Sequence, residues 1–211
     1  LGLQPQLERY GVAAQEFAFF NRHGQFIMAE PCGILAGYEY PHFSIHRADL
    51  HKVLLDAVID RLGPNTVNLG HRCLGVDQDE TSATVRFQDT VSRTGAIAIA
   101  VDGFHSSVRR QFYPDEGIPH FGGINMWRGV TRRKPFLTGG SVTRVGTVAR
   151  GKMTIYPIRQ FEDGTQLINW NTEQPREDHK PNDWATPGQI EDFIEPSQSW
   201  NFDWLDIPGL I

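Results

Sequence analysis

A run of small apolar residues ends at an Asp-Gly pair near the middle of this chain. Residues 96–112 read AIAIAVDGFHSSVRRQF, and the first six are continuous and apolar, as is typical of a strand buried on both faces. Asp102 and Gly103 follow at the carboxyl end of this predicted strand, where open α/β sheets bind ligands. The residues after them begin a helix. The stretch therefore predicts an α/β unit with a ligand site near Asp102.

Two interpretations of this Asp-Gly pair fit the spacing. Asp102 can cap the following helix with Gly103 in a tight turn, because Asp is a preferred N-cap residue. Alternatively, Gly103 lets a ligand approach the backbone, the first helical amides face a phosphate, and Arg109 or Arg110 adds charge-assisted bonds. Spacing alone favours the cap and leaves the ligand role open.

The chain before this stretch predicts a β-ribbon, a long helix and three short strands. Residues 16–21 and 25–30 are aromatic and β-branched runs joined by a hairpin-length loop. Residues 44–65 predict a helix with Ser44 as N-cap and a stop at Gly63-Pro64. Its apolar stripe comprises Leu50, Val53, Leu54, Ala57, Val58 and Leu62. The short strands are predicted at 66–69, 72–77 and 82–87.

The chain from residue 123 onward is rich in strand signals. Strands are predicted at 124–131, 143–149, 153–158 and 166–171, with turn residues between them, which is the spacing of an antiparallel sheet. Thr186-Pro187 predicts the start of a short helix over 187–195. Dense Pro and Gly at 112–122 mark a boundary. We therefore expect one domain over 1–115 and a sheet domain over 116–211.

The segment DGFHSSVR resembles a known fingerprint, DGxxSxVR, of FAD-dependent aromatic-ring monooxygenases of the para-hydroxybenzoate hydroxylase type. The matching residues are Asp102, Gly103, Ser106, Val108 and Arg109. A second segment, SIHRADLHKVLLDAV, is similar to the family's R-x-x-L-x-x-x-L helix start, satisfied by Arg47, Leu50 and Leu54. In that family the first segment lies beside the pyrophosphates of FAD and NAD(P)H, and the Arg of the second reaches the FAD phosphate and ribose.

Three further segments, YPHFSIHRADLH, GGINMWRGVT and WNFDWLDI, resemble the branch that contains the pyocyanin-forming phenazine monooxygenases. The resemblance extends over essentially the whole chain. The family's GxGxxG strand–turn–helix and its later GDAAH-like segment have no counterpart in these residues. The resemblance therefore implies a central fragment, with part of an FAD/NAD(P)-binding Rossmann-like α/β domain and an antiparallel substrate-binding sheet. Ala100-Val101 replaces the usual Gly-Ala, and the added methyl groups could crowd a cofactor.

The resemblance also implies an activity. The intact enzyme would use NAD(P)H to reduce bound FAD, react it with O2 and hydroxylate a small aromatic acid through a flavin hydroperoxide. The flavin carries this chemistry, so no acid–base residue is nominated as catalytic. The fragment alone is expected to be inactive. The alternative is a non-catalytic remnant that keeps the sheet and ligand affinity without turnover.

The resemblance assigns site residues to both halves. The residues expected to bind the cofactor are Arg47, Cys73, Asp102, Gly103, Ser106 and Arg109. The residues expected to line the substrate pocket are Trp127, Arg128, Tyr156 and Trp170. Aromatic walls with one cation suit a planar carboxylated substrate, although aromatic residues on strands more often belong to a core.

Composition excludes several other classes of protein. A formal charge of −5 and a pI near 5.9 give no basic surplus, which argues against a nucleic-acid partner. No apolar run approaches a membrane span, and two cysteines, Cys32 and Cys73, suggest reduced thiols in a cytoplasmic protein. The histidines at 42, 46 and 51 lack the spacing and the carboxylate of a metal site. The oligomeric state has no signal in the sequence.

Overall fold

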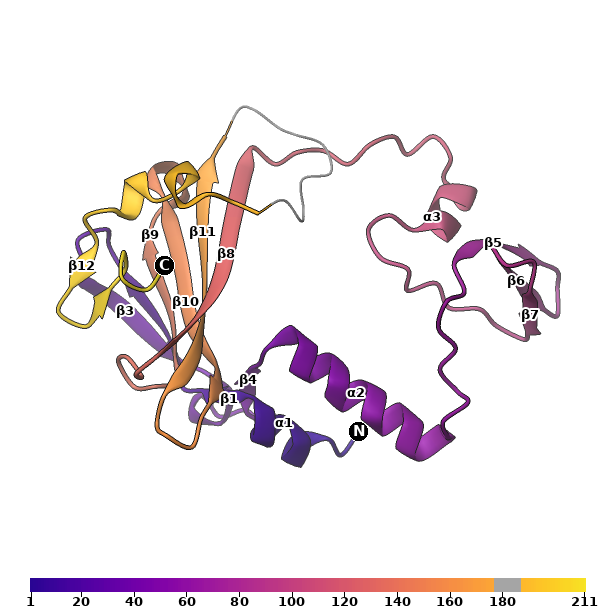
Figure 1. Ribbon diagram of the computed structural model, residues 1–211, viewed down its shortest axis with the longest axis horizontal. Helices are drawn as coiled ribbons and strands as arrows, with labels where there is room; N and C mark the ends of the chain where they lie inside the picture. Colours follow the sequence, from indigo (N-terminus) through magenta and orange to yellow (C-terminus); the bar gives the residue numbers. More distant parts are fainter. Residues whose placement is uncertain (177–186) are drawn as a thin grey trace. The chain divides into compact units, whose positions relative to one another are not determined.

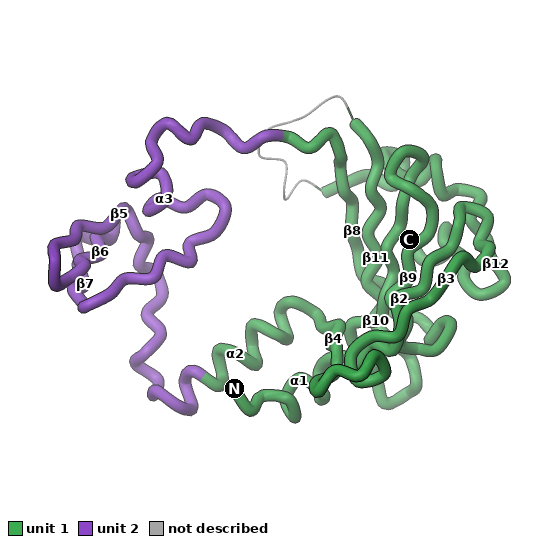
Figure 2. The backbone as a smooth tube through the Cα atoms, turned by 180° about the vertical axis from the view of Figure 1, so that it is seen from behind, with its two compact units in different colours: residues 1–57, 121–211 green, residues 58–120 purple. Residues whose placement is uncertain are grey.

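The computed structural model describes residues 1–176 and 187–211. Contacts divide the chain into two compact units, which are described separately (Figure 2). Unit 1 comprises Leu1–Ala57 and Phe121–Ile211, and unit 2 comprises Val58–His120. The structure thus groups residues 1–57 with the later sheet, whereas the expected functional division lay between residues 115 and 116. That functional division remains a prediction.

Unit 1 is built on a six-stranded sheet with the order β3-β2-β9-β10-β11-β8 (Figure 1). The strands are β2 Glu16–Phe20, β3 Phe26–Pro31, β8 Ile124–Arg133, β9 Ser141–Gly146, β10 Lys152–Gln160 and β11 Gln166–Pro175. Neighbouring strands are antiparallel except for the parallel pair β2–β9. The predicted antiparallel strands and the β-ribbon are confirmed. The ribbon joins this sheet through β9, which the local pattern did not predict.

Burial alternates along β8 and β11, so the sheet has two distinct faces. In β8 the odd-numbered side chains are half-buried and the even-numbered ones are exposed, as the period of a strand requires. One face, here called the covered face, packs under the chain segment 190–211. The other, here called the open face, carries the even-numbered side chains of β8 and the residues that pair with them.

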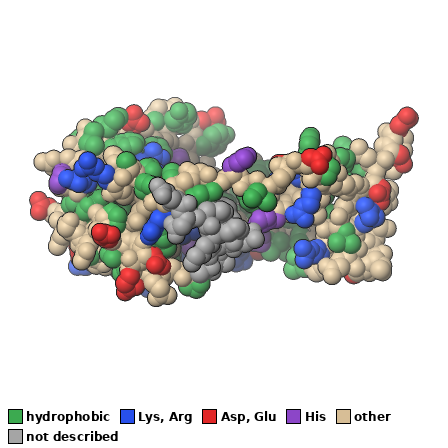
Figure 3. All heavy atoms as spheres, turned by 90° about the horizontal axis from the view of Figure 1, so that it is seen from above, with side chains coloured by type: hydrophobic (Ala, Val, Ile, Leu, Met, Phe, Trp, Pro, Cys, Tyr) green, Lys and Arg blue, Asp and Glu red, His purple; other side chains and the backbone are tan. Residues whose placement is uncertain are grey.

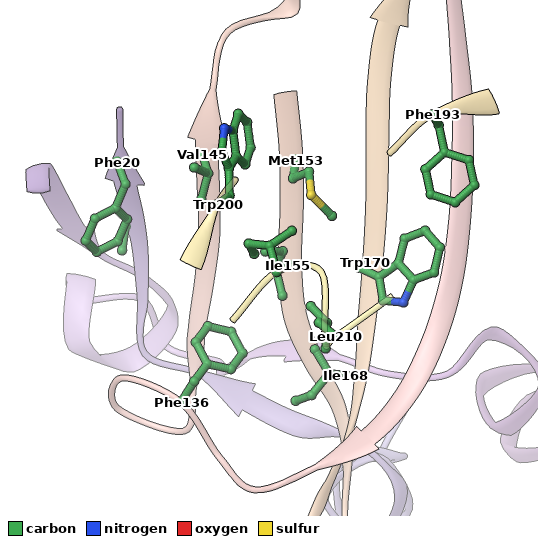
Figure 4. Packing of buried hydrophobic residues seen from close by; sticks show 12 residues of the cluster. Phe20, Phe136, Val145, Met153, Ile155, Ile168, Trp170, Phe193, Trp200 and Leu210 are labelled. Carbon is green, nitrogen blue, oxygen red and sulfur yellow. The ribbon is translucent and has the colours of Figure 1, made fainter. Parts of the chain in front are cut away.

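The main hydrophobic core lies between the covered face and this last segment (Figure 4). Met153, Ile155 and Ile168 from the sheet meet Trp200 and Leu210 from the segment. Each such side chain, when fully buried, contributes about 1.5–3 kcal/mol to stability. The segment contains two 3-10 turns, η3 Ile190–Asp192 and η4 Glu195–Ser197, and a small hairpin of β12 Asn201–Phe202 and β13 Leu205–Asp206.

The helix predicted over 187–195 is wrong, because the 3-10 turn η3 forms there and η4 begins at Glu195. Besides its own short turns, the backbone of this region binds the sheet, as the carbonyl of Phe193 accepts a 2.6 Å hydrogen bond from Nε2 of Gln174. Gly188 also lies so close to Trp127 that a Cβ would overlap the indole ring. The predicted cap residue, Thr186, lies outside the described residues.

Unit 1 also contains short elements from the first quarter of the chain. They are α1 Gln4–Tyr10, β1 Val12–Ala14, η1 Gly33–Ala36 and β4 His42–Ser44, with β1 pairing antiparallel to β4. The helix α2 Arg47–Leu62 follows and extends into unit 2. The predicted cap at Ser44 is wrong: Ser44 belongs to β4, and Nδ1 of His46 accepts the amide of Ala48. The predicted stop is confirmed at Gly63, whose φ is 93°.

Unit 2 contains a three-stranded antiparallel meander and a short helix. The strands are β5 Cys73–Gln78, β6 Ala83–Phe87 and β7 Ser92–Gly95, and the helix is α3 Ser107–Phe112, which contacts β5. The strand predicted at 66–69 is wrong, and β7 is the third strand instead. The turn between β5 and β6 is closed by Asp79, whose carboxylate accepts hydrogen bonds from Thr81 and Ser82.

The buried strand predicted at 96–101 does not form in this structure. Ile97, Ile99 and Val101 are 79%, 81% and 89% exposed. A strand needs a neighbour to satisfy its amides and carbonyls, and no strand pairs with these residues in the described part of the chain. No helix among the described residues is long and apolar enough to cross a membrane.

Candidate functional site

The Asp-Gly segment of unit 2 folds as a turn closed on the start of α3. Oδ1 of Asp102 accepts a 2.6 Å hydrogen bond from the hydroxyl of Ser106, and Oδ2 accepts the Ser107 amide at 2.9 Å. The hydrogen bond from Ser106 and those from the amides that follow lower the pKa of Asp102. Gly103 adopts a φ of 76°, a conformation that favours glycine. Asp102 is therefore held ionised and fixed in place.

This geometry supports the first of the two interpretations of the Asp-Gly pair, the helix cap. The amides of Ser107 and Val108 donate to Asp102, and the amide of Arg109 donates to Oγ of Ser106 at 2.9 Å. Ser106 is the N-cap residue. Capping by a carboxylate and a hydroxyl satisfies the donors that a helix start leaves unpaired. The capping role of this segment is therefore realised in the structure.

Arg109 forms an ion pair and a further hydrogen bond within unit 2. Its Nε donates to Oε2 of Glu116 at 2.8 Å, and a terminal nitrogen donates to the carbonyl of Phe104 at 2.6 Å. A cavity of about 140 Å³ lies beside it, lined by Ser106, Arg109 and Arg110 among others. Cavities for drug-sized ligands measure about 300–1,000 Å³. This cavity can therefore accept a phosphate-sized group and is too small for a whole dinucleotide.

Cys73 lies next to the Asp-Gly segment. Its carbonyl accepts a 2.9 Å hydrogen bond from the hydroxyl of Ser107, which ties β5 to α3. Gln111 strengthens this contact, because its side chain bonds both the amide and the carbonyl of Val76. The structure thus brings together five of the residues expected at the cofactor: Cys73, Asp102, Gly103, Ser106 and Arg109.

Arg47, the sixth of these residues, is the first residue of α2 and belongs to unit 1. Its side chain is exposed, and no hydrogen bond or ion pair joins it to another described residue. A cation at a helix start opposes the helix dipole. An unpaired arginine in this unfavourable position fits an anionic ligand. The convergence of Arg47 and Asp102 on one diphosphate remains a prediction.

The four residues expected at the substrate divide between the two faces of the sheet. Trp127 and Trp170 point to the covered face, where both stack near Phe193. Trp170 is 7% exposed, and its Nε1 donates to Oγ1 of Thr131 at 3.2 Å (Figure 4). These two tryptophans hold the last segment of the chain on the sheet. They do not share a surface with the other two residues.

Arg128 and Tyr156 lie on the open face. Arg128 is exposed at the middle of β8, and no hydrogen bond or ion pair joins it to another described residue. Tyr156 is half-buried and packs against a small cluster of Ala14, Cys32 and Val142. The open face thus offers a cation and a phenol on one surface.

The register of the sheet adds residues that the sequence analysis missed. Arg128 pairs with Asn171, Asn171 with Thr154, and Thr154 with Arg144. Directly opposite residues share a face, so all four lie on the open face. The alternation of side chains within 143–149 and 153–158 could have shown which residues share a face in each strand. The alignment of the strands could not be obtained that way.

A cavity of about 600 Å³ lies elsewhere in unit 1, at the end of β8. Its lining includes Arg133, Lys134, Phe136 and Trp204, and none of the predicted site residues. Within the described residues, no group of three or more metal-ligating side chains lies close enough to hold an ion. Cys32 and Cys73 are both free thiols.

Comparison with known proteins shows which proteins the chain is similar to. It is 34% identical to the phenazine 1,6-dicarboxylic acid hydroxylase PhzS of Lysobacter antibioticus, over 100% of this chain and 54% of that protein. The chain is a homologue of flavin-dependent aromatic hydroxylases. A second such hydroxylase, the 3-amino-4-hydroxybenzoate 2-monooxygenase PtmB3 of Streptomyces platensis, is 27% identical over 86% of this chain and 43% of its own length. No family model matches the sequence.

The fold of these hydroxylases is also found among solved structures. Klebsiella pneumoniae HpxO, complexed with FAD and uric acid, aligns with a TM-score of 0.65 at 20% identity, over 95% of this chain and 48% of that one. The comparisons confirm the resemblance to FAD-dependent aromatic monooxygenases and the mixed α/β fold class. The chain spans about half the length of the curated relatives that it matches.

Proposed function

We propose that the whole protein is an FAD-dependent monooxygenase that hydroxylates a small aromatic acid with NAD(P)H as reductant. The observation that carries this proposal is the match of the entire chain to a phenazine dicarboxylic acid hydroxylase at 34% identity. The named substrates of the relatives, a phenazine dicarboxylic acid and an aminohydroxybenzoate, are planar and carboxylated. A planar aromatic acid is therefore the substrate class that we assign.

We assign the cofactor contacts to Arg47 and to the Asp-Gly segment. The exposed guanidinium of Arg47 can pair with a phosphate, and Arg110 borders the phosphate-sized cavity in unit 2. Asp102, held ionised by Ser106, accepts hydrogen bonds and so suits a ribose hydroxyl better than a phosphate. A bound flavin, reduced by NAD(P)H, supplies the oxygen chemistry, while the protein orients the substrate and excludes water.

The open face supplies the substrate contacts in this proposal. The guanidinium of Arg128 can bind a carboxylate through two parallel hydrogen bonds. The ring of Tyr156, fixed against the Ala14–Cys32–Val142 cluster, offers an aromatic edge and a hydroxyl to a planar ring. Trp127 and Trp170, which point to the covered face, support the sheet behind these contacts.

The test is aromatic-dependent turnover by the whole protein. Purified protein reconstituted with FAD is mixed with NADH or NADPH, and oxygen uptake is recorded with and without hydroxybenzoates and phenazine carboxylic acids. The proposal expects aromatic-stimulated oxygen uptake and a hydroxylated product by mass spectrometry. Flavin-loaded protein that forms no hydroxylated product with any aromatic acid of this panel overturns it.

A second function, ligand binding without turnover, is supported by two observations for the 211 residues alone. The cavity at the Asp-Gly segment is too small for a dinucleotide, and Arg109 is already paired with Glu116. Flavin absorbance separates the two functions. A purified 211-residue chain that stays colourless with added FAD, yet binds aromatic acids, fits the binding function. The two free thiols fit a cytoplasmic location, which belongs to the proposal as well.

A further inference from the structure

Basic side chains are spread over the open face of the sheet, and most of them already have partners. Acidic and basic groups are also interspersed on the surface that Figure 3 draws. Arg132 pairs with Asp163 at 2.7 Å, Lys152 with Glu173 at 2.7 Å, and Arg159 with Asp49 at 3.6 Å. These three ion pairs neutralise Arg132, Lys152 and Arg159, which are three of the cations on the open face.

Two arginines of the open face remain without an acidic partner among the described residues, namely Arg128 on β8 and Arg144 on β9. Arg128 has no polar contact with another described side chain, and Arg144 lies over the ring of Phe19, 5.6 Å from its centroid. Glu173, the carboxylate nearest in register, is held by Lys152 and by a 3.4 Å hydrogen bond from Asn171. Among the described residues, the open face therefore carries two positive charges without an acidic partner.

These two arginines belong to one row across the sheet. The row runs Phe19, Arg144, Thr154, Asn171, Arg128, each residue directly opposite the next. Strands lie about 4.8 Å apart, so the two arginine Cα atoms, three strands apart in the order β9-β10-β11-β8, are separated by roughly 14 Å. Between them lie only a hydroxyl and an amide. The part of the row from Arg144 to Arg128 is therefore polar, with a guanidinium at each end.

We propose that Arg144 is a second specificity residue and that the preferred ligand is a planar aromatic dicarboxylate lying along this row. One carboxylate binds Arg128 and the other binds Arg144, while the fused rings lie over Thr154 and Asn171 beside Phe19. The long side chains of Arg144 and Arg128, separated by this span, can contact the opposite ends of a two- or three-ring molecule. A monocarboxylate satisfies one arginine and leaves the other unpaired. This inference rests on the proposed function, because it names the substrate class of that same face.

Binding can be measured without flavin or turnover. The probes are a naphthalene dicarboxylate with acid groups at opposite ends and naphthoate, which has one acid group, titrated against the 211-residue chain by calorimetry. The wild type is expected to bind the diacid about tenfold more tightly, which is roughly 1.4 kcal/mol. Arg144→Gln should abolish that preference and leave naphthoate affinity within about twofold.

Arg132→Gln is the matched control, because it removes the same charge from the same face at a residue already paired with Asp163. It should leave the diacid preference intact. Equal losses in the two variants, or no diacid preference in the wild type, overturn the proposal, and so does failure of both the chain and the whole protein to bind the diacid. Circular dichroism of each variant checks that it folds.

The two proposals fail separately. If the whole protein hydroxylates monocarboxylates while Arg144→Gln leaves the ratio of kcat/KM for diacid and monoacid unchanged, the dicarboxylate inference is wrong and the monooxygenase function stands. If the diacid preference depends on Arg144 while no aromatic acid is hydroxylated, the function is wrong and the binding row stands.

Discussion

Ser106 joins Asp102 to the first turn of α3, because its hydroxyl donates to Oδ1 of Asp102 at 2.6 Å while its Oγ accepts the amide of Arg109 at 2.9 Å. One nearly buried side chain thus holds the turn and the helix together. Asp102 in turn accepts the amides of Ser107 and Val108. The conformation of the Asp-Gly segment is therefore set by its own side chains.

Ser106→Ala should lower the stability of unit 2. The substitution removes the N-cap acceptor and one donor to Asp102, and loss of an N-cap costs about 0.5–2 kcal/mol. Urea unfolding followed by circular dichroism measures the change. Ser92→Ala, at an exposed position of β7, is the control and should shift the free energy of unfolding by less than about 0.5 kcal/mol. Equal effects of the two substitutions contradict the capping role.

The lowered pKa of Asp79 predicts how the stability of unit 2 depends on pH. Hydrogen bonds from Thr81 and Ser82 lower its pKa from 3.8 to about 2. Because the folded pKa lies below the unfolded value, the stabilisation is complete above 3.8 and is lost as the pH falls through 3.8 toward 2. Asp79→Asn should therefore be less stable than wild type at neutral pH and should approach it near pH 2. Unfolding curves at several pH values check this, and a constant difference across the range argues against it.

The sequence predicted the local elements of unit 1 well, because period-two alternation and turn residues are local signals. It could not predict that β2 pairs in parallel with β9, since residues 16–20 and 141–145 are far apart in the chain. It also assigned Trp127 and Arg128 to one pocket, although neighbours in a strand face opposite sides. Which side is covered depends on residues 190–211, and no local pattern of β8 contains that information.

The prediction for the Asp-Gly segment was partly right, because the helix cap depends on nearby residues whereas the strand depends on distant ones. Short-range chemistry predicts that Asp102 caps the helix, and the structure has this cap. The apolar run at 96–101 predicts a strand only if neighbours surround it. Ile97 and Ile99 are exposed here, because no strand pairs with them in the described residues.

Gly129→Ala should destabilise unit 1 through Trp170. A Cβ at residue 129 would lie 2.4 Å from the indole ring, which is fixed by its bond to Thr131. Overpacking of this kind costs about 1–3 kcal/mol. Gly122→Ala is the matched control, since nothing lies within 4 Å of its Cβ position and its φ is not positive. Thermal unfolding should separate the two variants, and indistinguishable melting curves speak against close packing at Gly129.

Trp170→Ala tests the assignment of this residue to the covered face. Removal of a buried tryptophan costs about 3–5 kcal/mol. Because Trp170 points away from Arg128 and Tyr156, aromatic acid affinity measured below the unfolding transition should stay within about twofold of wild type. Calorimetric titration at low temperature checks this. A large loss of affinity in folded protein contradicts the separation of the two faces.

Arg47→Ala should weaken FAD retention by the whole protein. A charge-assisted contact with a phosphate contributes about 1.5–3 kcal/mol, so the dissociation constant should rise by roughly 10- to 150-fold. Fluorescence titration with FAD measures this. Lys52→Ala, in the same helix and already paired with Asp56 at 2.6 Å, should leave FAD affinity unchanged.

The stability of the apoprotein separates a ligand contact from a structural one at Arg47. A cation at the start of α2 opposes the helix dipole, so its removal should leave the unfolding free energy unchanged or raise it by about 0.3–1 kcal/mol. FAD affinity is therefore expected to fall while apoprotein stability stays the same or rises. If Arg47→Ala lowers FAD affinity only as much as it lowers the folded fraction, the residue supports the helix and the phosphate role fails, because a purely structural defect reduces cofactor binding in that way alone.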